Sequence, residues 1–213
     1  MVRAKTFVEQ REGIAETMAL GKTRRMLAAA LGALGLSLAA APTVAGEPPL
    51  EGRFGERFQL NAGPQRVPDV EITTRRGETV SLRDRRGQVL LVNFWATWCP
   101  PCVEEMPTLD GLAAEMNSER FKVMAVSTDR GGADTVEDFL DKKMSLDSLD
   151  IYLDPEAKLA RAFEVKGMPT TYLVDADGVI VGYLQGAADW NSAPVKKLIR
   201  HYIERAATDS ASG

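Results

Sequence analysis

The strongest hydrophobic pattern in the chain is the unbroken apolar run at residues 89–95, Val-Leu-Leu-Val-Asn-Phe-Trp. Such a run, rich in β-branched and aromatic residues, is typical of a strand buried on both faces of a sheet. A helical pattern follows at about residues 101–117, with Pro107 inside it, and a second apolar run occupies residues 121–127. Strand, helix and strand at this spacing predict a right-handed parallel crossover.

Shorter patterns surround this crossover. Residues 70–73 and 79–82 alternate apolar and polar positions around Arg76-Gly77, which predicts a β-hairpin. Residues 170–175 and 179–184 form a second predicted hairpin, turning at Asp177-Gly178. The remaining predicted elements are a helix at 135–143, a strand at 149–153, a helix at 156–163 and an amphipathic helix at 191–206. The chain is therefore predicted to be an α/β protein with a mixed central sheet flanked by helices.

The composition divides the chain into four parts. Residues 46–67 are rich in Pro, Gly and charge, which predicts a linker or an extended lead-in. The domain proper is expected at 68–208, followed by a tail at 209–213. Residues 1–45 are of a different kind: Lys22, Arg24 and Arg25 precede an apolar stretch that ends in small residues at Ala45. This pattern is typical of an export signal.

The apolar part of this N-terminal segment, residues 26–41, is shorter than the roughly 20 residues preferred for a membrane span. Cleavage after Ala45 is the preferred interpretation, and an uncleaved membrane anchor is the alternative. The pair Arg24-Arg25 fits a twin-arginine signal as well as an ordinary Sec signal, and Met18 is an alternative start to Met1. In each case the domain is expected in the periplasm, where disulfides persist.

The charge distribution bears on the partners. Residues 1–45 carry six Lys or Arg and three Glu, a net +3, so that the formal charge of -4 for the whole chain leaves -7 for the remainder. An acidic domain is a poor nucleic-acid binder, because phosphate recognition requires basic patches. We therefore expect no nucleic-acid partner.

The two cysteines of the chain, Cys99 and Cys102, lie where the first predicted strand gives way to a helix. The unpaired N–H groups and the dipole at a helix N-terminus favour a thiolate, and can lower a thiol pKa by roughly 1 to 5 units from about 8.5. A zinc site would need four ligands, and the chain adds only His201, about a hundred residues away. We therefore expect a redox-active disulfide, with no metal and no organic cofactor.

The order of the residues in this motif suggests their roles. Cys99, nearer solvent, is expected to attack a disulfide, and Cys102, one turn into the helix, to resolve the mixed disulfide. Pro100 and Pro101 remove two N–H groups that could stabilise the thiolate. The thiol pKa should then be less depressed than in strongly oxidising proteins with a similar cysteine pair. The reduced form is correspondingly less favoured, which predicts a reductant.

Three stretches resemble the thioredoxin superfamily, and in particular the TlpA/ResA-type membrane-associated thiol-disulfide oxidoreductases. They are Asn93-Phe94-Trp95-Ala96-Thr97-Trp98-Cys99-Pro100-Pro101-Cys102, Glu105-Met106-Pro107 and Gly167-Met168-Pro169-Thr170-Thr171. The resemblance covers about residues 68–206. It implies a thioredoxin-like fold with an N-terminal β-hairpin and a central insertion at about 130–165.

The resemblance also assigns a docking surface for client proteins. Pro169 corresponds to the cis-proline that lies against the two sulfurs in the superfamily, and a cis bond would turn the backbone of Met168 toward a client for strand-like pairing. A trans proline at the start of a strand is the alternative. Trp98 is expected beside Cys99 as part of the same surface.

Glu105 and Asn93 are expected to tune the two thiols. Glu105 stands three residues after Cys102, nearly one helical turn, and in the ResA-type pattern an acid at this offset lies by the active site. A buried carboxylate next to a thiolate would raise both pKa values; a first-turn acid that complements the helix dipole is the alternative. Asn93 replaces the buried acid of thioredoxins, which leaves Glu105 as the candidate proton acceptor.

The resemblance implies a reductase that is itself re-reduced by a membrane electron donor. Its clients would be apocytochrome c, as for ResA-type proteins, or the copper-site cysteines of oxidase assembly proteins, as for TlpA-type proteins; the Gly186–Trp190 stretch favours the TlpA side. A peroxiredoxin-like peroxidase is one alternative, although Val92 stands where such enzymes have Pro, seven residues before the cysteine. A Cu(I) carrier using both thiolates is the other.

Overall fold

The computed structural model describes residues 46–212, with side chains up to Asp209. The expected export signal or anchor, residues 1–45, lies outside the described residues. Within the described part, no helix has both the length and the apolar character needed to span a membrane.

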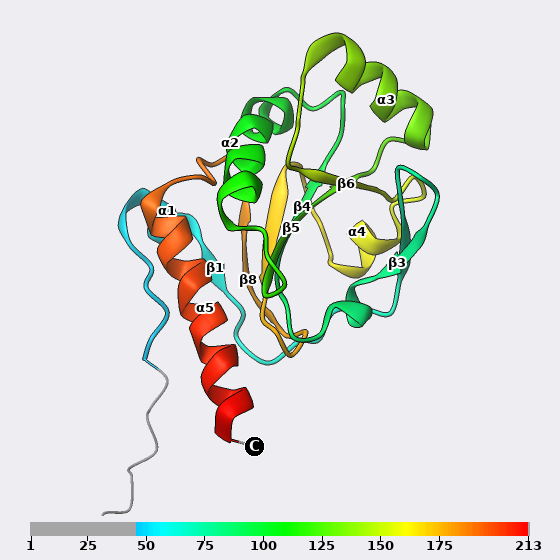
Figure 1. Cartoon of the computed structure of the whole chain (residues 1–213). Helices are drawn as coiled ribbons and strands as arrows, with labels where there is room; N and C mark the ends of the chain where they lie inside the picture. The colour runs from blue at the N-terminus through cyan, green and yellow to red at the C-terminus, as the bar shows by residue number, and fades with distance from the viewer. Residues whose placement is uncertain (1–45, 213) are drawn as a thin grey trace, which may run out of the picture. The chain divides into compact units, whose positions relative to one another are not determined.

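A single mixed sheet forms the centre of the domain (Figure 1). Its strands are β1 (Gln59–Leu60), β2 (Glu71–Thr74), β3 (Thr79–Ser81), β4 (Val89–Trp95), β5 (Phe121–Ser127), β6 (Asp150–Leu153), β7 (Thr170–Val174) and β8 (Ile180–Gln185). The helices are α1 (Gly52–Arg57), the 3-10 turn η1 (Leu82–Arg85), α2 (Pro100–Met116), α3 (Gly132–Lys143), α4 (Lys158–Ala162) and α5 (Ala193–Ser212). The strand order is β1-β8-β7-β4-β5-β6-β2-β3.

The predicted crossover occupies the middle of this sheet. All seven residues of β4 are buried, and β4 pairs in parallel with β5 and antiparallel with β7. Helix α2 connects β4 to β5 and continues through Pro107 to Met116. The β4–α2–β5 unit is therefore as predicted, and it places the cysteine pair at the carboxyl end of the most buried strand.

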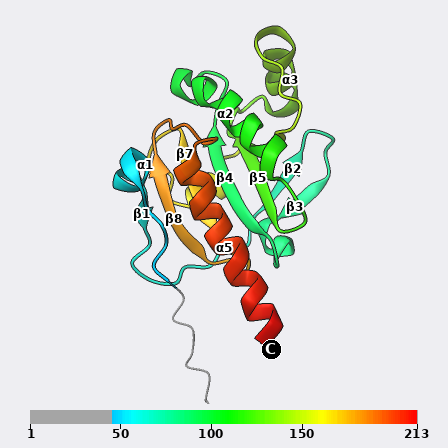
Figure 2. The same cartoon turned by 60° about the vertical axis from the view of Figure 1, so that its left-hand side comes forward.

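Helices cover both faces of the sheet. One face carries α2, α5 and α3, whose buried side chains Leu109, Leu198 and Val136 belong to the same core cluster as Leu91; Figure 2 shows α2 and α5 in front of the sheet. The other face carries α4 and η1, and Phe94 packs there against Phe163. Alternate residues of β4 thus belong to different cores, as a strand buried on both faces requires.

The predicted hairpin and insertion join each other. Strands β2 and β3 pair antiparallel, with Ile72 opposite Val80. β2 also pairs with β6, where Thr73 lies opposite Leu153, and β6 pairs in parallel with β5. The block expected as an insertion, about 130–165, consists of α3, β6 and α4. It extends the sheet and brings the hairpin onto it.

The linker predicted at residues 46–67 is wrong for the part between Gly52 and Leu60. This segment contains α1 and β1, and β1 pairs with β8 at the edge of the sheet. Phe58 and Val67 are buried. β1 approaches β8 so closely that a Cβ on Gly182 would lie 2.3 Å from the carbonyl oxygen of Gln59. The glycine and charge content concealed Phe54 and Phe58, which lie one helical turn apart and pack against each other.

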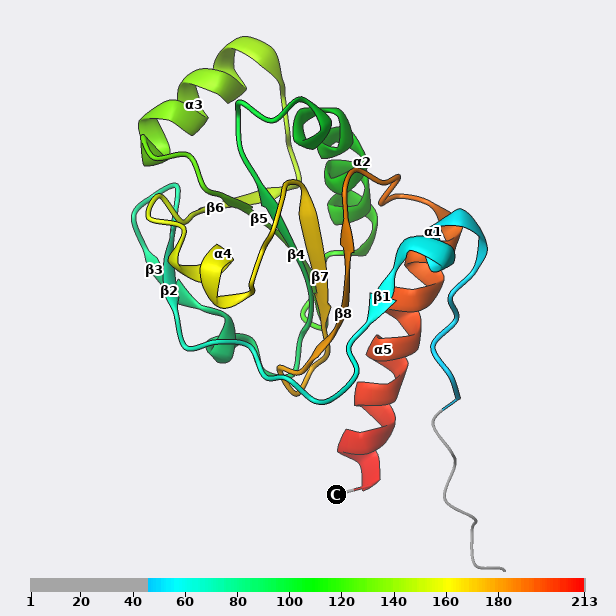
Figure 3. The ribbon, with the colours of Figure 1, turned by 180° about the vertical axis from the view of Figure 1, so that it is seen from behind.

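The predicted C-terminal tail, residues 209–213, is also wrong. Helix α5 begins at Ala193, two residues later than predicted, and continues to Ser212. The sequence from Arg205 to Ser212 contains no Gly or Pro to end the helix. Figure 3 shows α1 and β1 beside the first turns of this helix.

Candidate active site

Cys99 and Cys102 form a disulfide at the start of α2, with their Cα atoms 5.3 Å apart. Cys99 is the N-cap residue of the helix. It keeps 4% of its surface exposed, whereas Cys102 has none. The order of exposure agrees with the predicted roles, in which the outer sulfur attacks and the inner sulfur resolves.

Pro100 and Pro101 occupy the first turn of α2. Prolines fit there because the first helical N–H groups have no partner within the helix. The backbone N–H groups of Cys102 and Val103 both donate to the carbonyl oxygen of Cys99. Both prolines therefore lie in the first helical turn, as expected. Their effect on the thiol pKa stays a prediction.

A buried aspartate that the sequence reasoning did not single out holds the turn before the disulfide. Asp129 follows β5 and is 3% exposed. Its carboxylate accepts from the backbone N–H of Thr97 (2.9 Å), the hydroxyl of Thr97 (2.7 Å) and the hydroxyl of Ser127 (2.8 Å). The signal was available, because an acid directly after β5 must lie beside the end of the parallel neighbour β4.

The predicted docking residues are Trp98, in this turn, and Met168 and Pro169, in the loop before β7. Trp98 is 68% exposed, a rare environment for an indole. The peptide bond between Met168 and Pro169 is cis, as predicted. The hydroxyl of Thr128 lies 3.5 Å from the sulfur of Met168, and its backbone N–H donates to the carbonyl oxygen of Trp95. Residues 127–129 thus connect the redox turn to the Met168 loop.

Glu105 is buried inside the domain, with 2% of its surface exposed. Its Oε1 accepts from Asn93 Nδ2 at 2.7 Å. Its Oε2 accepts from the indole N–H of Trp190 at 2.8 Å and from the backbone N–H of Ala188 at 3.0 Å. Burial raises the pKa of this carboxyl from 4.5 to about 7, even though the three donors and the charge of Arg57 lower it. Glu105 also lies beyond the first turn of α2, which contains no acid, so the alternative of a first-turn acid that complements the helix dipole is wrong.

Asn93 lies on β4 directly beneath this carboxylate. Its Nδ2 also donates to the hydroxyl of Thr171 at 2.9 Å. Its Oδ1 is buried and has no hydrogen-bond partner among the described residues. Asn93 is thus in contact with Glu105, the residue predicted to replace the missing acid at position 93. Both residues belong to the buried end of the site. Glu105 lies three residues, less than one helical turn, after Cys102.

Trp190, the last residue of the Gly186–Trp190 stretch, is fully buried. The sequence reasoning missed its polar role: besides the indole bond to Glu105, its backbone N–H donates to the hydroxyl of Thr108 on α2 at 3.1 Å. These bonds attach the segment before α5 to the active-site helix. Nothing in the spacing of residues 105 and 190 could have indicated a contact across 85 positions.

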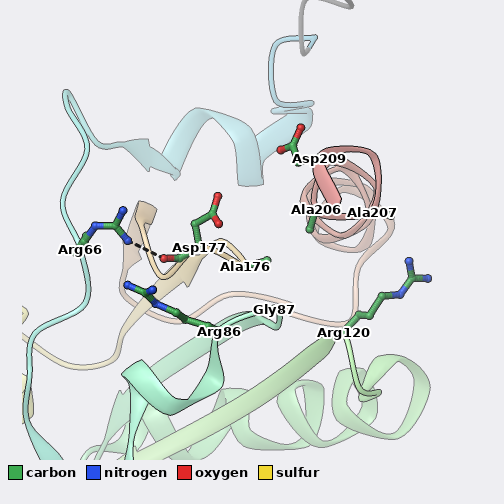
Figure 4. A pocket seen from close by; sticks show the side chains of 9 residues that line it. All are labelled: Arg66, Arg86, Gly87, Arg120, Ala176, Asp177, Ala206, Ala207 and Asp209. Carbon is green, nitrogen blue, oxygen red and sulfur yellow. Dashed lines mark hydrogen bonds between the residues drawn. The ribbon is translucent and has the colours of Figure 1, made fainter. Parts of the chain in front are cut away.

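An open cavity lies at the other end of the sheet. It has a volume of about 560 Å³ and is lined by Arg66, Arg86 and Arg120 together with Asp177 and Asp209. Figure 4 shows Arg66 bound through its guanidinium to the carbonyl oxygen of Asp177. Gly87 and Arg120, which precede β4 and β5, line it, whereas the disulfide follows β4. The described residues contain no group of three or more His, Cys, Asp or Glu side chains placed to hold a metal ion.

Comparison with known proteins agrees with this arrangement. Residues 64–183 match the model of the AhpC/TSA family. Thiol-disulfide oxidoreductase ResA of Halalkalibacterium halodurans is 33% identical over 128 residues, which are 60% of this chain and 70% of the relative.

Solved structures give the same result. A Chlorobium tepidum protein assigned as thiol:disulfide interchange protein DsbE superposes with a TM-score of 0.58 at 27% identity, covering 68% of this chain and 99% of that one. The exposed lipoprotein thioredoxin Etrx1 of Streptococcus pneumoniae gives a TM-score of 0.53 at 27% identity, covering 62% and 99%. The fold is thus thioredoxin-like, as the motifs implied. The chain belongs to the AhpC/TSA family and is a thiol-disulfide oxidoreductase of the ResA type.

Proposed function

We propose that this oxidoreductase works as a reductase of disulfides in client proteins outside the cytoplasm. The observation that carries the proposal is the combination of an exposed Trp98 beside Cys99 with a buried, protonatable Glu105 behind Cys102. An exposed aromatic ring suits a protein surface as substrate. The extracytoplasmic location is supported by the pattern of residues 1–45 and by the similarity to an exposed lipoprotein thioredoxin.

The reaction transfers two electrons from the dithiol to the client. The Cys99 thiolate attacks one sulfur of the client disulfide, and the other client sulfur leaves as a thiolate that takes up a proton. Cys102 then loses its proton and attacks the sulfur of Cys99. The second client thiolate leaves and is protonated, and the Cys99–Cys102 disulfide forms.

Glu105 would accept the proton that Cys102 gives up. Side chains three residues apart on a helix are neighbours, and both groups are buried. A carboxyl with a pKa of about 7 can both take up and release a proton near neutral pH, as general acid–base catalysis requires. The donors Asn93 and Trp190 keep its oxygens in place.

The cycle closes when a membrane electron donor reduces the Cys99–Cys102 disulfide by the same exchange in reverse. The client class would be apocytochrome c, whose paired thiols must be reduced before haem attachment, or the copper-site cysteines of oxidase assembly proteins. The similarity to ResA supports the first class. The second class is supported by the resemblance of the Gly186–Trp190 stretch to TlpA-type proteins.

The first test is the reduction potential, measured by equilibrating the protein in glutathione buffers and counting alkylated thiols by mass. A value near that of thioredoxin, about -270 mV, is expected for a reductase. A value above about -180 mV would mean that the protein oxidises or isomerises disulfides, and the proposal would fail.

Client trapping is the second test. Cys102→Ser should retain clients as mixed disulfides on Cys99, whereas Cys99→Ser should retain none. A peroxide-consumption assay on the same preparation distinguishes the peroxidase alternative that the family name raises. Stoichiometric copper retained by the reduced protein against a competing chelator would instead indicate the Cu(I) carrier.

A further inference from the structure

The segment 185–190, between β8 and α5, covers the Glu105 carboxylate. It supplies two of the three donors to that carboxylate, the backbone N–H of Ala188 and the indole of Trp190. Gly186 within it has a φ of 88°, a left-handed conformation that glycine adopts without strain. The position of this segment therefore decides whether Glu105 keeps its partners.

Helix α1 holds this segment from outside. The guanidinium of Arg57 donates to the carbonyl oxygen of Ala187 at 3.0 Å and to that of Gln185 at 3.2 Å. The two bonds bracket Gly186, and a Cβ on Gly186 would lie 3.2 Å from the same guanidinium. Phe54, also on α1, meets the ring of Trp190 edge-on, with centroids 6.1 Å apart.

Helix α1 is also anchored at points outside the segment. β1 follows it directly and pairs with β8, Phe58 is buried, and Glu51 forms an ion pair with Lys197 of α5. Arg57 therefore extends from a fixed helix onto two carbonyl groups of the segment. A planar guanidinium suits this task because its N–H groups form a rigid fork.

We propose that Arg57 is a positioning residue for Glu105: it fixes the segment 185–190 over the carboxylate, so that α1, which precedes the thioredoxin core, adjusts the buried acid. The bond chain runs from the guanidinium through Gln185 and Ala187 to Ala188 and Trp190, and from these to Glu105. The consequence for turnover rests on the proposed function; the effect on the carboxyl itself does not.

The groups that face Glu105 differ in charge. Asn93 of β4 and Trp190 are neutral donors, Cys102 on the same helix is in the disulfide, and Arg57 contributes a positive charge that lowers the pKa of Glu105. Asp189 lies in the same segment, where its carboxylate accepts from the backbone N–H of Asn191. Loss of Arg57 removes a charge that favours the ionised carboxyl and releases the segment that carries two donors. Removal of this charge raises the pKa of Glu105, and release of the segment opens the Ala188 and Trp190 N–H groups to exchange.

The test is a pH titration of the Glu105 side-chain carboxyl by carbon-13 NMR in the oxidised protein, which needs no turnover. Arg57→Ala should raise the midpoint by about 0.2 to 0.7 of a pH unit, the range typical of one exposed charge contact. The same variant should speed hydrogen exchange at the Trp190 indole and the Ala188 amide. Arg57→Lys should restore much of the midpoint, because it keeps the charge, and less of the protection.

Arg53→Ala is the matched control. Arg53 is an exposed arginine of the same helix, so its loss changes the net charge of the protein equally. An unchanged midpoint and unchanged exchange are expected for it. If Arg57→Ala and Arg53→Ala give the same midpoint or the same exchange at Trp190, the proposal is wrong. Failure of the protein to reduce disulfides would leave this titration unaffected and would count only against the proposed function.

Discussion

Two buried carboxylates, Asp129 and Glu105, accept hydrogen bonds from different parts of the active-site region. Asp129 takes its three bonds from Thr97, in the turn between β4 and α2, and from Ser127, the last residue of β5. Glu105 takes its three from Asn93, Ala188 and Trp190, which belong to the centre of β4 and to the segment before α5.

The difference lies in what each carboxylate can do. Asp129 is bound by hydroxyl and amide groups close to the turn that carries Trp98, so it fixes the shape of the redox turn. Glu105 lies among buried apolar and aromatic side chains, and the cost of burying its charge raises its pKa to about 7. One acid is suited to structure and the other to proton exchange.

The largest expected effect is a pH dependence of stability that belongs to Glu105. Because its pKa is 4.5 in the unfolded chain and about 7 in the folded protein, the folded protein keeps a proton that the unfolded chain loses between these values. Stability should therefore fall by about 3 kcal/mol as the pH rises from about 4.5 to about 7. Urea unfolding of the oxidised protein at several pH values measures this. In Glu105→Gln this component should be absent.

Asp129→Asn is the control for that experiment, and it should keep the fall between pH 4.5 and 7. The contradicting outcome is an unfolding free energy of Glu105→Gln that falls with pH as that of the wild type does. In that case the Glu105 carboxyl does not titrate in this range, and the distinction between a structural Asp129 and a proton-exchanging Glu105 is wrong.

The second effect concerns the redox turn. Asp129→Ala leaves the Thr97 N–H and the buried Ser127 hydroxyl without their acceptor and should destabilise the protein by about 2 kcal/mol. It should also change the fluorescence of Trp98, since the turn is released. Asp129→Asn, which keeps an acceptor, should lose less than half as much. Equal losses in the two variants would contradict a role through hydrogen bonds.

A smaller effect is expected at the indole donor. Trp190→Phe keeps an aromatic ring in the core but removes the donor that lowers the pKa of Glu105 most. That pKa should therefore rise above about 7 by ~0.7 of a unit, the equivalent of one hydrogen bond. Asn93→Ala should raise it less, because its bond lowers the pKa least of the three. Carboxyl NMR titration ranks the two variants, and the reverse order would refute this ranking of donors.

The smallest effect on stability is expected at the surface. Trp98 is 68% exposed, and Trp98→Ala should change the unfolding free energy by less than about 0.5 kcal/mol. The rate of client reduction should fall all the same, with KM rising more than kcat falls. A loss of stability comparable to that of Asp129→Ala would show that the ring is part of the fold and not of the docking surface.

Much of this arrangement could be predicted from local patterns. The apolar run of β4, the two hairpins and the position of Cys99 and Cys102 at a helix start follow from spacing alone. The cis bond before Pro169 and the inward direction of Glu105 followed from resemblance. In each case the evidence lies within about ten residues of the feature that it predicts.

The remaining features depend on long-range pairing. A six-residue helix with two glycines, such as α1, carries too little periodicity to be recognised, and the strand β1 that follows it pairs with β8, far along the chain. The donors of Glu105 include Trp190, 85 positions away. Periodicity identifies Trp190 as apolar and buried, but it does not tell which polar atom its indole meets. The position of Asp129 beside the redox turn could have been predicted, because the carboxyl ends of the parallel strands β4 and β5 meet at the same edge of the sheet.

The order of the strands has a consequence for self-association. The sheet ends at β1 and β3, which have two and three residues, and very short edge strands offer few unpaired N–H and C=O groups to another chain. A protein that we propose pairs with the extended backbone of its clients at Met168 thus presents little sheet edge elsewhere in its described part. We expect it to stay monodisperse at concentrations where an open-edged sheet of similar size would aggregate.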